Sequence, residues 1–362
     1  MSAEGQVRQL RVAEEDDGIR LDRWFRRNLP EVSFGQISRW ARTGQLRLDG
    51  RRAAPGDRIE AGQTVRVPPQ GDEAPAPRRQ VQRPALNEDE IEFVRSLVVH
   101  EDQAAFVLNK PPGLATQGGT KTKDHLDRLL DGLAGDGGRP KLVHRLDKDT
   151  SGVLLVARTP RAAAFFSKSF SGRTARKVYW AIVTGVPAVA DGLIELPLAK
   201  QPGTGGEKMH VDEAEGLPAK TRYRVIERAG NRAAWVELQP HTGRTHQLRV
   251  HMAAIGHPIL GDGKYGGPDA FLTGAISRKL HLHARRIRID HPDGGRIEVA
   301  AELPDHFAAT LAALGFDPAL GDLPLDEIKF SETPEGRRKA VSAAAKARRK
   351  ERKGERRNRR RG

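Results

Sequence analysis

Residues His144–Leu154 read HRLDKDTSGVL, and this segment decides how the rest of the chain is interpreted. It sets one carboxylate, Asp147, between an arginine and a polar turn that ends at Gly152. The run GVLLVA that starts at Gly152 has the length and the apolar, β-branched content of a strand. We therefore expect Asp147 in a loop that leads into a strand. An Asp in such a loop more often closes a turn or a salt bridge than performs catalysis, so motifs elsewhere in the chain must decide its role.

The length and the composition of the chain limit the classes of protein to which it can belong. The chain has 362 residues, no Cys and three Met, a length that suits two domains with extensions. The absence of Cys excludes disulfides, Cys-ligated zinc and thiol nucleophiles, and it fits a reducing compartment. The N-terminal MSAEGQVRQL has no apolar stretch, and no apolar run approaches the ~20 residues that cross a bilayer. We expect a soluble, cytoplasmic protein that has no membrane partner.

Positive charge gathers near the two ends of the chain. The net charge is +15, and residues 337–362 hold fourteen Lys/Arg against two Asp/Glu, a net +12. Residues 18–68 hold eleven Arg against five Asp/Glu, a net +6, which leaves −3 for the rest. Basic segments bind polyanions because Lys and Arg that neutralise phosphates release condensed counterions. We favour nucleic acid as the partner. The alternatives are that the basic tail is only solvated, or that it tethers the protein to an anionic membrane surface.

Residues 18–68 predict a small αβ module. Helical spacing of large apolar residues predicts two short helices, the second of them capped by Ser33. The segments LRLDGRRA (46–53) and TVRVPP (64–69) alternate apolar and charged residues, and the first contains a DG turn, so both predict strands. Residues 69–90 are rich in Pro, Gln and Arg and predict a linker. The apolar positions that predict the helices are Leu21, Trp24, Phe25, Ile37, Trp40 and Ala41.

Residues 91–316 predict the main domain. Short β-branched runs separated by Gly and Pro turns indicate a mixed, mainly antiparallel sheet, and with the module the fold class is α+β. The segment RIRIDHPDGGRIEVAA (286–301) predicts a hairpin around DGG. Apolar content fades in residues 317–362, which predict an extension and a disordered basic tail. Helices are expected within 123–133, 157–172, 245–256 and 304–315.

Three further motifs accompany HRLDKDTSG: NKPPGLATQGG (109–119), KVYWAIVTG (177–185) and HTGRTHQLRVH (241–251). In this order they resemble the motifs of the RluA-type pseudouridine synthases. The module at 18–68 resembles a small RNA-binding module that a ribosomal small-subunit protein, tyrosyl-tRNA synthetases and many pseudouridine synthases share. The resemblance implies a pseudouridine synthase fold and isomerisation of uridine to pseudouridine in RNA, most often large-subunit ribosomal RNA. It also implies a monomer that needs no cofactor.

The resemblance assigns three catalytic residues. Asp147 becomes the catalytic carboxylate, which either attacks C1′ as a nucleophile or removes a ribose proton, and the sequence leaves both paths open. Tyr179 becomes the ring that stacks on the uracil, although a core Tyr on a strand is the alternative. The motif at 241–251 holds the salt-bridge partner that keeps Asp147 ionised. Either Arg244 or Arg249 fits this role, and we favour Arg249, with Arg244 as a backbone or phosphate contact.

The resemblance also assigns RNA contacts. Arg145 matches the residue that fills the gap left by the flipped base, with a plain phosphate contact as the alternative. Lys110 is a candidate phosphate ligand, whereas His144 and Lys148 receive no catalytic role. The segment HPILGDGKYGG (257–267) is expected to be structural. Candidate RNA contacts in the module are Arg23, Arg26, Arg27, Arg39, Arg42 and Arg47.

No metal site is predicted. His241, His246 and His251 are spaced by five, which puts them on no common face of a helix or strand. Two other functions compete with isomerisation. One is a catalytically idle RNA-binding or ribosome-assembly protein, against which an intact Asp147 argues. The other is an N-glycosidase that releases uracil, which would need a second acid that the motifs do not show.

Overall fold

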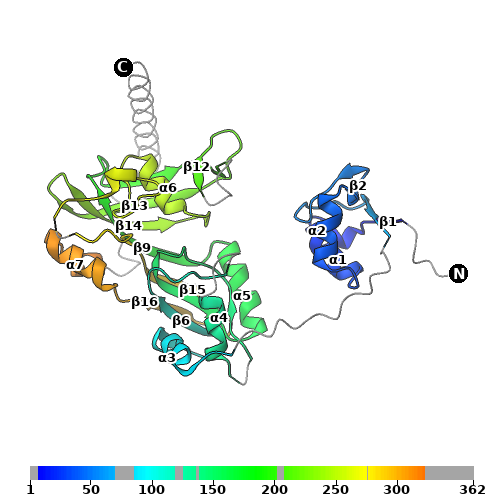
Figure 1. The fold of residues 1–362 in the computed structure, drawn as a ribbon, viewed down its shortest axis with the longest axis horizontal. Coiled ribbons are helices and arrows are strands. Elements are labelled where there is room, and N and C mark those ends of the chain that lie inside the picture. Colours follow the sequence, from blue (N-terminus) through cyan, green and yellow to red (C-terminus); the bar gives the residue numbers. More distant parts are fainter. Residues whose placement is uncertain are drawn as a thin grey trace, which may run out of the picture. The chain divides into compact units, whose positions relative to one another are not determined.

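The computed structural model of the chain describes residues 7–69, 85–118, 125–135, 138–201, 208–274 and 276–322. The chain divides into two compact units, Met1–Pro84 and Ala85–Gly362 (Figure 1). Most of the predicted linker and the predicted basic tail at 337–362 lie outside the described residues. Within the described ranges, no helix combines the length and the apolar character that a membrane crossing requires.

The first unit contains the two predicted helices, α1 (Leu21–Asn28) and α2 (Phe34–Arg42). Ser33 caps α2 as predicted: its hydroxyl accepts from the Gln36 backbone N–H, and the Gln36 side chain accepts from the Ser33 N–H. The helices bury Leu21, Trp24, Phe25, Ile37 and Trp40 in the core of the unit. The sheet has the order β1-β4-β2-β3 and consists of β1 (Arg8–Arg11), β2 (Arg47–Leu48), β3 (Arg51–Arg52) and β4 (Thr64–Val67).

Two strand pairings of this sheet differ in how far they can be predicted from the sequence. The DG turn joins β2 to β3, and Asp49 and Gly50 both have positive φ, as a two-residue hairpin turn requires. In contrast, β1 was not predicted, and it pairs with β4 far along the chain. The module was predicted to begin at Gly18, but the folded unit begins at least ten residues earlier, with β1.

The second unit is built on a ten-stranded sheet. Its path is β10-β13-β14-β9-β15-β8-β6-β5, with β16 paired to β15 and β7 paired to β8. Only β8 and β15 run parallel among the pairs that the described strands form, which confirms a mixed, mainly antiparallel sheet. The strands are β5 (Val98–Glu101), β6 (Ala105–Lys110), β7 (Lys141–Leu142), β8 (Ser151–Ala157), β9 (Arg176–Thr184), β10 (Asp191–Glu195), β13 (Lys220–Ala229), β14 (Ala233–Pro240), β15 (Leu282–Asp290) and β16 (Arg296–Ala300), and a separate pair is β11 (Leu198–Lys200) and β12 (Met209–Val211).

All four predicted helical segments of this unit contain helices, and the β15–β16 hairpin turns at the predicted DGG. Helix α3 was missed because it begins inside the segment interpreted as linker, where Asn87 and Glu90 form a capping box. The helices are α3 (Glu88–Ser96), α4 (Leu126–Leu129), α5 (Pro160–Ser171), α6 (Gln247–Ala254) and α7 (Asp305–Leu314), with 3-10 turns η3 (Leu130–Leu133), η4 (Gly267–Ala270) and η5 (Pro318–Gly321).

Helices cover both faces of the sheet. On β9, Ala181 and Val183 pack in the cluster that contains residues of α6, whereas Trp180 and Ile182 pack in the cluster that contains residues of α7. This alternation follows from the two-residue repeat of a strand. Figure 1 shows α6 and α7 beside the β13–β14–β9 part of the sheet and α3, α4 and α5 beside the β6–β15 part. The central strand β9 is thus buried on both faces of the sheet and provides a rigid support within the second unit.

Candidate active site

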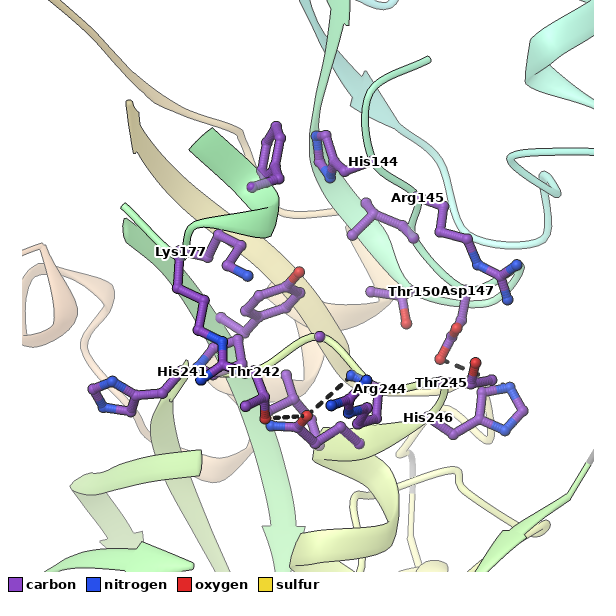
Figure 2. A pocket seen from close by; sticks show the side chains of 18 of the residues that line it. His144, Arg145, Asp147, Thr150, Lys177, His241, Thr242, Arg244, Thr245 and His246 are labelled. Atoms are coloured by element: carbon purple, nitrogen blue, oxygen red, sulfur yellow. Dashed lines mark hydrogen bonds and ion pairs between the residues drawn. The ribbon is translucent and has the colours of Figure 1, made fainter. Parts of the chain in front are cut away.

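Four chain segments surround one cavity of about 600 Å³ in the second unit. They are the loop from Val143 to Thr150, the C-terminal end of α5, the start of β9, and the turn that joins β14 to α6. The volume lies in the range of small-ligand pockets, ~300–1,000 Å³. In Figure 2, Asp147 faces Thr245 and His246 on one side of the cavity, and Lys177 and His241 lie on the other side. The motif residues Asp147, Tyr179, Arg244 and Arg249, as well as Arg145, all line this cavity.

Asp147 sits in a turn that holds its side chain at the cavity wall. The Thr150 backbone N–H donates to the Asp147 carbonyl at 3.2 Å, and the Asp147 side chain is 21% exposed. Among the residues described, Asp147 is the only acid that lines the cavity. A single carboxylate, mostly shielded from water, therefore faces a hollow large enough to hold a nucleoside.

The NKPPGLATQGG segment holds this turn in place. The Thr116 hydroxyl donates to the Leu146 carbonyl at 2.7 Å and accepts from the Leu146 N–H at 3.2 Å. The Gly113 N–H donates to the Lys148 carbonyl at 2.9 Å. The predicted phosphate role of Lys110 is wrong, because its ammonium is fully buried and already donates to three backbone carbonyls. Those carbonyls belong to Pro111, Leu114 and Lys148, so Lys110 ties the strand end of β6 to the Asp147 loop.

We expect Lys110→Met to lower the free energy of unfolding by about 3 kcal/mol, because it keeps the apolar stem but leaves buried carbonyls without a donor. Urea unfolding of the full chain measures the change. Turnover should also fall, because the Asp147 loop loses its hydrogen bond from the Lys110 side chain to the Lys148 carbonyl. A phosphate ligand would behave differently: stability would stay unchanged and RNA affinity would drop.

Tyr179 lies on β9 and lines the cavity. Burial, together with the negative charge of Asp147, raises the pKa of the Tyr179 hydroxyl above its usual value. The phenol therefore stays protonated at neutral pH and can donate a hydrogen bond. Its ring also contacts the two core clusters that meet under the cavity, so the functional and the core interpretations are both compatible with the fold.

The predicted ion pair between Arg249 and Asp147 is absent from the described part of the chain. Arg249 instead forms a bidentate pair with Asp262, with both bonds at 2.8 Å. Burial lowers the pKa of Arg249, but the Asp262 hydrogen bonds and carboxylate outweigh burial and raise it overall, with a smaller contribution from Asp147. The Arg244 Nε donates to the Pro218 carbonyl at 3.2 Å, which is a backbone contact. Within the described residues, the basic group that forms a close contact with Asp147 is His246, whose Nε2 lies 3.8 Å from Asp147 Oδ2.

His144 has a structural position. Its Nε2 accepts from the Leu155 N–H at 2.9 Å, and its ring stacks on Phe170 with centroids 4.2 Å apart. Burial, with the nearby Lys177 charge, lowers the pKa of His144 to about 3, so the ring is neutral. His144 thus fastens the start of the Asp147 loop to β8 and α5.

Comparison with known proteins supplies the family. Residues 104–254 match the model of the RNA pseudouridylate synthase family. An RNA pseudouridine synthase of Synechocystis is 35% identical over 315 residues, which span 84% of this chain and 91% of that protein. The ribosomal large subunit pseudouridine synthase C of Vibrio vulnificus is 34% identical over 79% of this chain and 89% of its own length. The chain belongs to the RNA pseudouridylate synthase family.

A solved relative agrees with this assignment. The human RNA pseudouridylate synthase domain containing 4 protein superposes with a TM-score of 0.53 at 30% identity, over 63% of this chain and 97% of that one. The family assignment confirms the resemblance that the four motifs carried. It also confirms a pseudouridine synthase fold for the unit that contains the cavity.

This pseudouridylate synthase has no evident metal cluster in the ranges that the structure describes. The three histidines of the 241–251 motif separate as their spacing predicts. His241 is exposed, His246 lies at the cavity, and His251 is buried between the Thr221 hydroxyl and the Leu196 carbonyl. Burial lowers the pKa of His251 to about 4, which makes it a neutral core residue.

The predicted RNA arginines of the first unit are all exposed, but they are not equivalent. Arg27 is engaged within the unit, because it pairs with the buried Asp16 at 2.9 Å and with Glu15 at 3.1 Å. Arg47 donates to the Gly50 carbonyl, and Arg39 also has a partner. The side chains without an ion pair or hydrogen bond in the described part of the chain are Arg23, Arg26 and Arg42.

Sequence analysis missed several groups at the site. Lys177 lines the cavity, and burial lowers its pKa. The Thr150 hydroxyl is buried at the cavity and has no hydrogen-bond partner in the described structure. Asp262 and Tyr265 come from HPILGDGKYGG, which was interpreted as structural only. The sequence shows an acid and a tyrosine in this segment, but nothing in their spacing indicates that Asp262 contacts Arg249 or that Tyr265 contacts His246.

Proposed function

We propose that this protein isomerises specific uridines to pseudouridine in large-subunit ribosomal RNA. The observation that carries the proposal is the lone carboxylate of Asp147 at a nucleoside-sized cavity whose floor holds Tyr179. Family membership supports isomerisation, and the matched synthases named for the ribosomal large subunit support the choice of RNA. The named relatives span most of this chain, so the comparison extends beyond the catalytic domain.

The reaction needs no external reagent. The C1′–N1 bond of uridine breaks with its electron pair left on N1, the freed uracil rotates, and C1′ joins C5. The proton on C5 is then lost to solvent or a side chain, and N1 takes up a proton in exchange. Asp147 either bonds to C1′ and is later displaced by C5, or removes a ribose proton while uracil leaves and returns that proton as C5 bonds to C1′. Both paths consume no cofactor. The cavity walls keep the uracil beside C1′ until the new bond forms.

The cavity residues supply binding as well as chemistry. The Tyr179 ring is placed to stack on the flipped base, and its neutral hydroxyl can donate to the nucleotide. The Thr150 hydroxyl and the Lys177 ammonium face the cavity and make no hydrogen bond or ion pair within the described residues. Arg145 is exposed at the cavity beside Asp147, where its plane can fill the gap left in the RNA stack. Arg249 positions α6 through Asp262 and adds positive potential near Asp147.

Hydrolysis to free uracil is the weaker alternative. Glycosidases that use water generally need two cooperating carboxylates. Among the cavity-lining residues that the structure describes, Asp147 has no acidic companion. The same carboxylate, half-shielded at the wall, also argues against an idle RNA-binding protein.

One incubation separates the three functions. The full-length protein is mixed with large-subunit ribosomal RNA that lacks pseudouridine, and the RNA is digested to nucleosides for mass spectrometry. Isomerisation yields pseudouridine with no release of base. Free uracil would instead establish a glycosidase, and unchanged RNA in a complex would leave only binding. Small-subunit RNA is the control substrate, and mapping pseudouridines in a strain without this protein identifies the target sites.

We further propose that the first unit increases RNA affinity through its unpartnered arginines. The triple change of Arg23, Arg26 and Arg42 to Gln should weaken RNA binding and reduce the slope of log affinity against log salt by about 2 to 3, because three phosphate contacts are lost. The same three residues changed to Lys are the matched control, which keeps the charge and should keep the slope. Filter binding at several salt concentrations measures both. An unchanged slope in the Gln variant would contradict this role.

The remaining expectations follow from the same substrate. A protein that modifies ribosomal RNA works where ribosomes assemble, so we propose a cytoplasmic location. We propose that it acts as a monomer, because one chain brings Asp147, Tyr179 and Arg145 to a single cavity. The basic segment at 337–362 would add affinity of the sequence-independent kind.

A further inference from the structure

His246 holds an unusual backbone conformation at the cavity. It precedes α6 with φ 53° and ψ 20°, in the left-handed region. Among the described non-glycine residues, only Asp49 and Arg173 also have positive φ. Such conformations are strained and persist where the surrounding structure requires them. Here the conformation carries the His246 side chain toward Asp147 (Figure 2).

A second residue favours the His246 tautomer that carries its proton on Nε2. The Met209 backbone N–H donates to the Tyr265 hydroxyl at 3.1 Å, so that hydroxyl is an acceptor and its own proton is free. The Tyr265 oxygen lies 2.6 Å from His246 Nδ1, close enough for the hydroxyl to donate to it. A neutral imidazole that accepts at Nδ1 carries its proton on Nε2. Nε2 is the atom that faces Asp147 Oδ2 at 3.8 Å.

Burial, assisted by two nearby cations, keeps the His246 ring neutral. Burial lowers the pKa of His246, and the charges of Arg249 and Lys264 lower it further. The carboxylates of Asp147 and Asp262 act in the opposite direction without reversing the shift. The ring is thus neutral at physiological pH and presents one N–H to Asp147.

We propose that His246 is a positioning residue for Asp147: the Nε2–H, oriented by Tyr265, binds Oδ2 and leaves Oδ1 directed at the ribose. The proposal rests on the isomerase function above and deepens it. The separation of 3.8 Å shortens to a hydrogen bond when RNA fills the cavity, as catalytic contacts often tighten only with substrate. Asp262 and Tyr265 therefore act as a pair, the first holding Arg249 and the second holding His246.

Kinetics provide one test. We expect His246→Ala to lower the single-turnover rate about 10- to 100-fold, the loss typical of a hydrogen bond to a charged group, with RNA affinity within about 2-fold. His246→Gln carries an amide N–H at the place of Nε2 and should recover most of the rate. Tyr265→Phe should slow the reaction less, and should have little further effect in the His246→Ala background. Equal rates for the Ala and Gln variants, or additive losses with Tyr265→Phe, would overturn the proposal.

A spectroscopic test does not depend on activity. In protein labelled with ¹⁵N-histidine, the signal that disappears in His246→Gln should show a neutral ring protonated at Nε2, and Tyr265→Phe should shift it toward a mixture of tautomers. A ring protonated at Nδ1 would overturn the inference, whatever the enzyme does. The predicted tautomer in a protein that forms no pseudouridine would instead refute the proposed function and leave the Tyr265–His246 arrangement standing.

Discussion

Asp147→Asn should reduce pseudouridine formation by at least about 10⁴-fold, because the amide keeps the shape of the side chain but can neither attack C1′ nor accept a ribose proton. RNA binding should stay within about 3-fold of the wild type, since Asp147 adds no positive charge and Arg145, Lys177 and the first unit are unchanged. Single-turnover formation of pseudouridine measures the first effect, and filter binding of the same RNA measures the second.

The chain offers a matched control for this variant. Asp149 is exposed, lies in the same turn, and does not line the cavity. Asp149→Asn removes the same charge two residues away and should keep turnover near the wild-type value. Turnover above about one per cent in Asp147→Asn would mean that another group performs the chemistry. A comparable loss in both variants would show that the turn, and not the carboxylate at 147, is what matters.

Gly152→Ala should have the largest effect on stability. Gly152 has φ +106° and pairs with Ala284 of β15 in the parallel part of the sheet. A Cβ added there would lie 2.2 Å from the Ala284 carbonyl oxygen and 2.7 Å from its nitrogen, so two strand backbones would have to separate. We expect a loss of more than about 4 kcal/mol in the free energy of unfolding. For a unit of this size that corresponds to a drop of at least about 8 °C in Tm, which calorimetry of the full chain can resolve.

Gly294→Ala separates backbone strain from the clash. Gly294 has a similar φ of +98° in the β15–β16 turn, but an added Cβ would meet nothing within 4 Å. This variant should lose only about 1 to 2 kcal/mol, the cost of a side chain in a left-handed conformation. If Gly152→Ala were no worse than Gly294→Ala, the close approach of β8 to β15 would not be what excludes a side chain at 152.

Much of the fold was predictable because its signals are local. The Ser33 capping box, the DG turn before β3 and the helical apolar spacing in α1 and α2 involve residues within a few positions of one another. Chain order of the four motifs likewise predicted the family. Asp147, Tyr179 and Arg249 were predicted at one site from that resemblance, and the cavity brings all three together.

The partners of the site residues were less predictable. Arg249 was matched to Asp147, whereas the fold supplies Asp262 as the nearer carboxylate with a bidentate geometry. Lys110 was predicted to bind a phosphate, although three carbonyls from two separate segments enclose its ammonium. Likewise, β1 was missed because its pairing with β4 depends on residues about fifty positions away. Each error concerns a contact between segments distant in the chain.

The sequence by itself determined the family, most of the helices and turns, and the carboxylate that we propose as catalytic, because these follow from residue types at short and fixed spacing. Only the tertiary structure decided what each charged group binds: Asp262 for Arg249, backbone carbonyls for Lys110, and His246 beside Asp147. The physical reason is that a charge pairs with whatever the fold brings within a few ångströms, and that distance is set by strand register and loop packing rather than by position along the chain.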